Sequence, residues 1–177
     1  MPTLEQAVAR IRNGDIGAFR ELVDETSPRL CRLAARIMGS VADGEDVVQD
    51  AYIKAYGALM QGRFDGRSHI HTWLYRIVTN TAITALRSRA RQRRVTDDPA
   101  TPVPGNPNSP ETHLAVSEIA EWMGALPPEQ RVTLVLKTLE GLTSGEIAAI
   151  MDCSEGAVEQ RLVRARAKLR ERQRYHD

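Results

Sequence analysis

The sequence predicts an all-α protein of two small helical domains joined by a flexible Pro-rich linker. Apolar residues recur at helical spacing along most of the chain, and no segment shows the sustained alternation of a β-strand. The helical pattern stops at Val95–Pro110, which carries five prolines and no large apolar residue beyond valine. We therefore expect a first domain over residues 1–94, the linker over residues 95–110 and a second domain over residues 111–177.

Turn signals divide the start of the first domain into short helices. An apolar repeat beginning at Leu4 predicts the first helix, which Asn13-Gly14 should end. A second apolar repeat, which includes Phe19, predicts the next helix. Ser27-Pro28 then predicts a separate helix that runs to about Met38, because serine favours the N-cap and proline the first turn.

Two longer helices complete the first domain. Asp43 is the expected N-cap of a helix that is apolar on one side and acidic near its start, where carboxylates suit the helix dipole. After the loop Gly62–His69, a long helix is expected from Ile70 to Arg94.

The second domain ends in a predicted helix-turn-helix. Its first helix should start near Ser109-Pro110-Glu111, and Pro127-Pro128 should separate that helix from the next. Thr143 and Glu146 form a capping box for a short helix, and Ser154 caps the last helix. A short helix, a tight turn and a long basic helix are typical of a motif that places its second helix in the DNA major groove.

The formal net charge of +1 conceals segregated blocks of charge. Acidic residues gather between Asp43 and Asp50, whereas basic residues gather over Arg87–Arg94 and again after Arg161. These blocks favour one face for an electropositive protein partner and two for nucleic acid, with solvated helix faces as the alternative interpretation.

The sequence contains no recognisable catalytic, metal or cofactor motif, so we expect neither an enzyme nor a cofactor. His69 and His71 have a metal-like spacing but no further ligand. Cys31 and Cys153 lack metal-ligand neighbours and predict no disulfide framework. The polar N-terminus and the absence of a long apolar run predict a cytoplasmic protein.

Aromatic and cationic residues alternate around the start of the long helix. Phe64, Trp73 and Tyr75 lie among arginines, and such surfaces bind unstacked bases through stacking worth about 1–3 kcal/mol per base. The alternative is that Phe64 and Trp73 are simply core residues, and the pattern alone leaves both open.

Three segments then resemble a known family. His71–Arg94, HTWLYRIVTNTAITALRSRARQRR, resembles the helix of bacterial sigma factors that reads the −10 element and melts DNA. Ala42–Leu59 resembles their core-polymerase-binding helix, and Leu126–Glu171 resembles their −35-reading domain. The short length and direct linker resemble the extracytoplasmic-function (ECF, group IV) class of sigma factor.

The resemblance implies three sets of binding residues. Contacts to core RNA polymerase, at the β′ clamp helices and the β subunit, are expected from Glu45, Asp46, Gln49, Asp50 and Lys54. Contacts to the −10 element are expected from Arg63, Phe64, Arg67, Ser68, Trp73, Tyr75, Arg76, Asn80 and Arg87. Contacts to the −35 element are expected from Ser154, Glu155, Gly156, Glu159, Gln160, Arg161, Arg164, Arg166 and Lys168, with Arg161 and Arg164 nearest the bases.

Glu159-Gln160 departs from the family pattern, in which a basic residue followed by serine is common. Glutamate can accept from cytosine and glutamine can pair with adenine, so an altered −35 preference is expected. Thr84 stands where an acidic residue is common, and we attach no mechanism to it.

The resemblance thus implies a sigma factor that directs promoter-specific initiation by core RNA polymerase, under the control of an anti-sigma factor. Two other classes remain open. A conventional helix-turn-helix regulator would bind duplex DNA without polymerase, but it leaves the acidic Asp43–Asp50 block unexplained. A protein-interaction adaptor that does not read DNA is the third.

Overall fold

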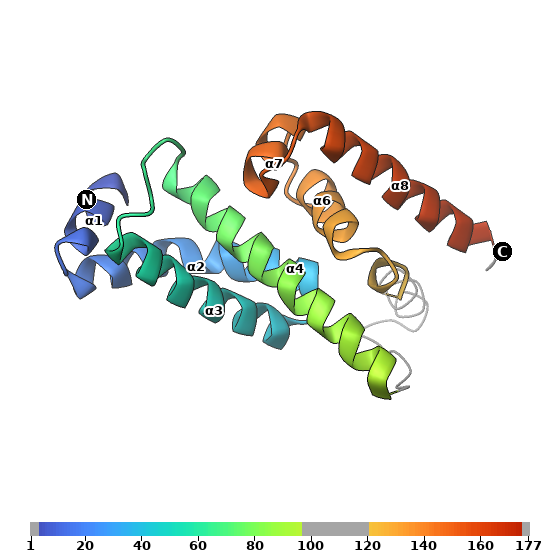
Figure 1. Ribbon diagram of the computed structural model, residues 1–177, viewed down its shortest axis with the longest axis horizontal. Coiled ribbons are helices and arrows are strands. Elements are labelled where there is room, and N and C mark those ends of the chain that lie inside the picture. Colours follow the sequence, from blue (N-terminus) through green and yellow to red (C-terminus); the bar gives the residue numbers. More distant parts are fainter. Residues whose placement is uncertain (1–3, 97–120, 175–177) are drawn as a thin grey trace.

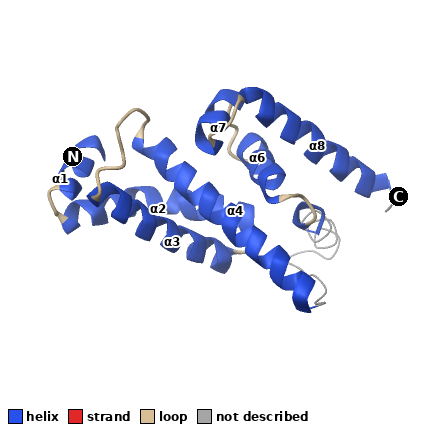
Figure 2. Ribbon diagram, in the orientation of Figure 1, coloured by secondary structure: helices blue, strands red, loops and turns tan. Residues whose placement is uncertain are grey.

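A computed structural model describes residues 4–96 and 121–174, and every regular element in these ranges is a helix (Figures 1 and 2). The all-α prediction is confirmed. A first group consists of α1 (Leu4–Arg12), α2 (Ile16–Met38), α3 (Val41–Met60) and α4 (Ile70–Thr96). A second group consists of α6 (Pro128–Thr138), α7 (Ser144–Met151) and α8 (Glu155–Arg174). The expected helix start at Ser109-Pro110-Glu111 and most of the expected linker lie outside the described residues.

The predicted helix break at Ser27-Pro28 was wrong, because α2 runs unbroken from Ile16 to Met38. A proline inside a helix costs about 3 kcal/mol through its missing N–H and its ring clash. Burial of apolar side chains on both sides of the proline offsets that cost, at about 1.5–3 kcal/mol for each large side chain. These side chains include Leu22, Leu30 and Leu33.

The predicted N-cap of α3 was also wrong. Ser40 is the N-cap, and its hydroxyl accepts a hydrogen bond from the backbone N–H of Asp43 at 3.3 Å. Asp43 therefore lies inside the first turn. Gly39, at φ 75°, ends α2 directly before the new cap, so α2 and α3 form a tight antiparallel hairpin.

The close packing of this hairpin depends on Gly44. A Cβ atom at this position would lie 2.5 Å from the backbone N and 2.8 Å from the Cα of Ala35. Only a residue without a side chain permits this approach of α3 to α2.

The predicted helix-turn-helix is confirmed in its local details. Thr143 and Glu146 form a reciprocal capping box at the start of α7. Asp152 ends α7 in the left-handed conformation at φ 50°, and the Ser154 hydroxyl accepts from the backbone N–H of Ala157 at 3.1 Å. The apolar residues at helical spacing, Val158, Leu162, Ala165 and Leu169, form the inner side of α8; the first three are buried and Leu169 is half-buried.

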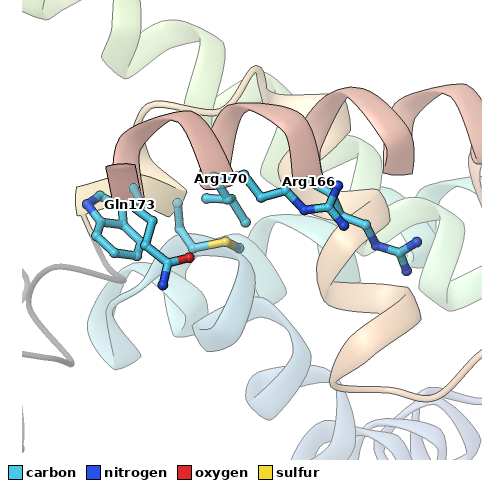
Figure 3. A pocket seen from close by; sticks show the side chains of 6 residues that line it. Arg166, Arg170 and Gln173 are labelled. Atoms are coloured by element: carbon cyan, nitrogen blue, oxygen red, sulfur yellow. The ribbon is translucent and has the colours of Figure 1, made fainter. Parts of the chain in front are cut away.

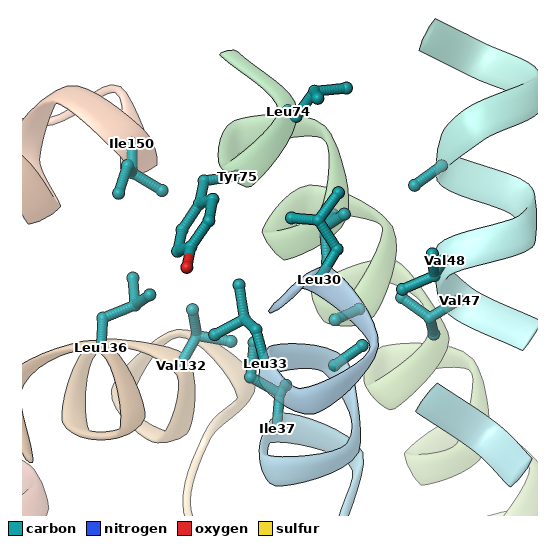
Figure 4. Packing of buried hydrophobic residues seen from close by; sticks show 14 of the residues in the cluster. Leu30, Leu33, Ile37, Val47, Val48, Leu74, Tyr75, Val132, Leu136 and Ile150 are labelled. Carbon is teal, nitrogen blue, oxygen red and sulfur yellow. The ribbon is translucent and has the colours of Figure 1, made fainter. Parts of the chain in front are cut away.

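The two helical groups pack against each other through α4 and α2 on one side and α6 and α7 on the other (Figure 1). Tyr75 of α4 lies close to Leu136 of α6 and Ile150 of α7, with Leu33 of α2 nearby (Figure 4). Buried residues of both groups therefore form one continuous apolar cluster. Among the described helices, none is long and apolar enough to cross a membrane.

Candidate polymerase and nucleic-acid interface

Three acidic side chains of α3 face outward, whereas Asp43 is half-buried beside Arg89 of α4. Glu45, Asp46, Gln49 and Asp50 are exposed, while Val47 is buried. This separation follows from the 3.6-residue period of the helix. The structure thus presents the expected polymerase-binding residues as one continuous acidic surface.

Ile53 extends this acidic surface and was missed by the sequence reasoning. Its side chain is 67% exposed, and it lies three residues after Asp50 on the same side of α3. An isoleucine at the exposed helical spacing of Asp46 and Asp50 was the signal that could have found it. Because Ile53 lies beside Asp50, a partner that binds the acidic surface would also cover this apolar side chain.

Lys54 differs from the other expected polymerase-binding residues because its side chain forms a hydrogen bond to α4. Its Nζ donates to the Thr81 hydroxyl at 3.1 Å. Farther along α4, Arg89 forms an ion pair with Asp43 of α3. The hydrogen bond from Arg89 is the main cause that lowers the pKa of the Asp43 carboxyl below its ordinary value.

The loop between α3 and α4 exposes Arg63 and Arg67, and Ser68 is half-buried. Gly62 and Gly66 adopt positive φ angles, of 67° and 73°. The backbone N–H of Arg67 donates to Asp65 Oδ1 at 3.0 Å. The loop is therefore bent back on itself, with its cations in solvent.

Phe64 anchors this loop to the core. It is buried, its ring centroid lies 5.1 Å from that of Trp73, and its carbonyl accepts a hydrogen bond from Arg12 of α1. Of the two alternatives left open, the structure favours the core role for Phe64. Trp73 is half-buried, so one part of its indole remains accessible beside the loop.

Three of the expected −10 residues contact the second helical group. The Tyr75 hydroxyl donates to Glu140 Oε2 at 3.3 Å, Arg76 Nη2 donates to the Ala149 carbonyl at 2.6 Å, and Arg87 pairs with Glu129. Asn80, by contrast, is exposed.

The expected −35 residues on α8 divide into two sets. Arg161 is half-buried, and its Nη1 lies 3.3 Å from Cys153 Sγ, inside the helix-turn-helix. Glu159 accepts a hydrogen bond from the Ser144 hydroxyl of α7. The remaining polar and cationic side chains of the set are exposed: Gln160, Arg164, Arg166 and Lys168.

The remaining residues expected to contact the −35 element lie at the N-terminal end of α8. Ser154 uses its hydroxyl in the cap, and Glu155 and Gly156 are exposed in the first turn.

Val163 was missed by the sequence reasoning although it is 64% exposed between Gln160 and Arg164. A valine outside the Val158–Leu162–Ala165 stripe was the available signal, and an exposed aliphatic group can contact a thymine methyl.

Comparison with known proteins identifies the family. The sequence model described as "ECF sigma factor" matches residues 1–175. The chain belongs to the ECF sigma factor family. The "RNA polymerase sigma-H factor" of Pseudomonas aeruginosa is 37% identical in an alignment of 174 residues that covers 92% of this chain and 89% of that protein. The "ECF RNA polymerase sigma-E factor" of Escherichia coli is 37% identical in an alignment of 171 residues that covers 90% of this chain and 88% of that protein.

Two solved structures resemble this ECF sigma factor over most of its length. CnrH, solved in complex with the cytosolic domain of CnrY, matches with a TM-score of 0.65 and 29% identity over 97% of both chains. The sigma factor RpoE of Bartonella quintana, solved with the anti-sigma factor NepR, matches with a TM-score of 0.64 and 25% identity over 88% of this chain and 96% of its own.

The far half of α8 in this sigma factor borders a shallow groove. Arg166, Arg170 and Gln173 line it from α8, and Trp122, Met123 and Leu169 supply apolar surface (Figure 3). The lining residues that belong to α8, Arg166, Leu169, Arg170 and Gln173, lie one helical turn apart, so the groove follows one side of this helix. Within the described ranges, no cluster of three or more metal-ligating side chains occurs in the sigma factor.

Proposed function

We propose that this ECF sigma factor binds core RNA polymerase through α3 and directs initiation at specific promoters. The observation that carries the proposal is the separation of charge on the folded chain: α3 exposes carboxylates and Ile53, whereas α8 exposes Arg164, Arg166 and Lys168. The acidic surface suits basic clamp helices of the β′ subunit, and the exposed cations of α8 suit DNA phosphates.

The two helical groups would read different parts of the promoter. Residues 1–94 would form the domain for polymerase binding and −10 recognition, residues 95–110 a flexible linker and residues 111–177 the −35-reading domain. Gln160, Val163 and Arg164 would contact base edges in the major groove, with Arg166 and Lys168 on phosphates. Arg63, Arg67, Trp73 and Asn80 would hold unpaired −10 bases, since flipping a base costs a few kcal/mol and needs a shaped, cationic pocket.

Chemistry in this scheme belongs to the polymerase, and the sigma factor supplies recognition and melting. It would act in the cytoplasm, where core polymerase works. An anti-sigma factor is the expected regulator, supported by the similar structure of RpoE, which was solved in complex with the anti-sigma factor NepR.

Multi-round transcription from a pool of genomic fragments tests this function. Core polymerase is assayed with and without the protein, and discrete new transcript starts that need the protein are the expected result. Tight binding of the free protein to duplex DNA with no new transcripts would instead establish the conventional helix-turn-helix regulator.

A further inference from the structure

The contact between the two helical groups contains a buried carboxylate. The Glu140 side chain, in the turn after α6, is only 8% exposed and accepts from Arg36 Nη1 of α2 at 2.6 Å. Its second oxygen accepts from the Tyr75 hydroxyl of α4 at 3.3 Å. One carboxylate therefore joins two helices of the first group to the second, and charge-assisted bonds of this kind are the stronger ones in proteins.

The same contact buries a residue expected to bind DNA. Tyr75 is 4% exposed and lies close to Leu136 and Ile150 of the second group, while Arg29 of α2 lies 5.3 Å from its ring centroid (Figure 4). Arg76 and Arg87 donate to Ala149 and Glu129. The second group thus occupies side chains that the −10 strand would need.

We propose that the −35-reading domain is an intramolecular competitor of −10 DNA, held over α4 by a latch of Glu140, Arg36 and Tyr75. This inference rests on the proposed function and adds a regulation of the same site. In the closed chain, α4 cannot offer Tyr75, Arg76 and Arg87 to a melted strand. The contact with DNA forms only after the two groups separate.

One residue at the same contact opposes closure. Arg131 of α6 is 8% exposed, and within the described residues its Nε has no hydrogen-bond partner. Burial, followed by the charges of Arg89 and Arg93 in α4, lowers the pKa of Arg131 to about 10. A buried cation beside two others is unfavourable, so Arg131 lowers the free energy needed to open the closed state.

If only open molecules bind DNA, the apparent affinity equals the intrinsic affinity multiplied by the fraction of molecules that are open. Breaking the latch with residues outside the binding sets should therefore open the chain and raise DNA affinity. Glu140→Arg places a cation against Arg36, and Arg36→Glu places a carboxylate against Glu140. Combining the two restores an opposite pair and should largely reclose the chain.

The first measurement is an interdomain distance in the free, full-length chain. Cysteines replace the exposed Glu25 of α2 and Glu171 of α8 in a Cys31→Ala/Cys153→Ala background, and each carries a spin label. A short, narrow distance distribution is expected for the parent, a longer and broader one for either single variant, and recovery in the double variant. A parent as broad as Glu140→Arg would overturn the latch. Because Arg36→Glu lies in the other helical group, misfolding of one domain cannot mimic both results.

The second measurement is the affinity of the free protein for a promoter fragment with an unpaired −10 region, taken from the transcription experiment. The single variants should bind about tenfold more tightly than the parent, and the double variant should return toward the parent value. Unchanged affinity in all three would overturn the competition. New transcripts from the parent with no distance response would reject the latch and retain the sigma function, whereas a distance response without transcripts would retain the latch and reject the function.

Discussion

The phenolic hydroxyl of Tyr75 donates a hydrogen bond to Oε2 of Glu140, joining the middle of α4 to the turn that follows α6. Burial, and then the charge of Glu140, raises the pKa of Tyr75 above its ordinary value of 10.0. Tyr75 is therefore a reporter of whether the two helical groups are in contact.

This relationship predicts a pH dependence of closure. Because the folded pKa is raised, the stabilisation from neutral Tyr75 is fully present below pH 10.0 and is lost as pH rises through the raised value. Ultraviolet titration of phenolate should show two late-titrating groups, one of which Tyr75→Phe removes and Glu140→Arg moves earlier. The other is Tyr52, whose pKa is also raised by burial and which should titrate late in every variant. A Tyr75 signal unaffected by Glu140→Arg would contradict the prediction.

Gly44→Ala should lower the free energy of unfolding by about 1–3 kcal/mol, because the new methyl group collides with the backbone of Ala35. Gly57→Ala is the matched control in the same helix. Its Cβ would meet nothing within 4 Å, so it should raise stability by about 0.5–1 kcal/mol. Urea denaturation measures both, and equal effects of the two substitutions would show that α2 and α3 do not approach as closely as described.

Asp50→Arg should weaken binding to core polymerase about tenfold while leaving the thermal unfolding midpoint unchanged, because the side chain is exposed in the acidic surface of α3. Asp24→Arg, an exposed charge reversal on α2, is the control and should bind normally. Fluorescence anisotropy of labelled protein against core enzyme measures the affinity. Loss of binding in both variants would point to net charge rather than to this surface.

Arg164→Ala and Arg161→Ala should differ although the residues are one helical turn apart. Arg164 is exposed, so its loss should weaken −35 binding by about 1–3 kcal/mol without changing stability. Arg161 Nη1 lies against Cys153 Sγ, so its loss should lower the unfolding midpoint. DNA affinity and thermal melts are compared side by side; a destabilised Arg164→Ala with a stable Arg161→Ala would reverse the assignment.

Asn80→Ala should reduce promoter melting more than it reduces holoenzyme formation, since the side chain is exposed on α4 and outside the interdomain contact. Permanganate reactivity of unpaired thymines in the holoenzyme complex measures melting. Thr84→Ala, also exposed and one turn farther along α4, is the control. Equal melting by both variants and the parent would remove Asn80 from the −10 site.

Local chemistry accounts for the parts of the fold that the sequence predicted. The Thr143–Glu146 capping box, the Ser154 cap and the stripe Val158–Leu162–Ala165 each depend on residues within one or two turns. The outward direction of Glu45, Asp46 and Asp50 follows from helical periodicity alone. The break predicted at Pro28 was wrong because distant packing outweighed a local preference, since Leu22 and Leu33 are buried on either side of the proline in α2. The cap predicted at Asp43 was wrong for a local reason, because Ser40 takes that place three residues earlier.

The sequence by itself determined the helices, the segregation of charge and the family to which the chain belongs, because these depend on residue order and short-range periodicity. Only the tertiary structure decided that Phe64 supports Trp73 from the core, that Arg161 points at Cys153, and that Glu140 meets Tyr75 across 65 positions of the chain. No periodicity encodes such contacts. They arise when apolar surfaces on separate helices are buried together and bring polar groups with them.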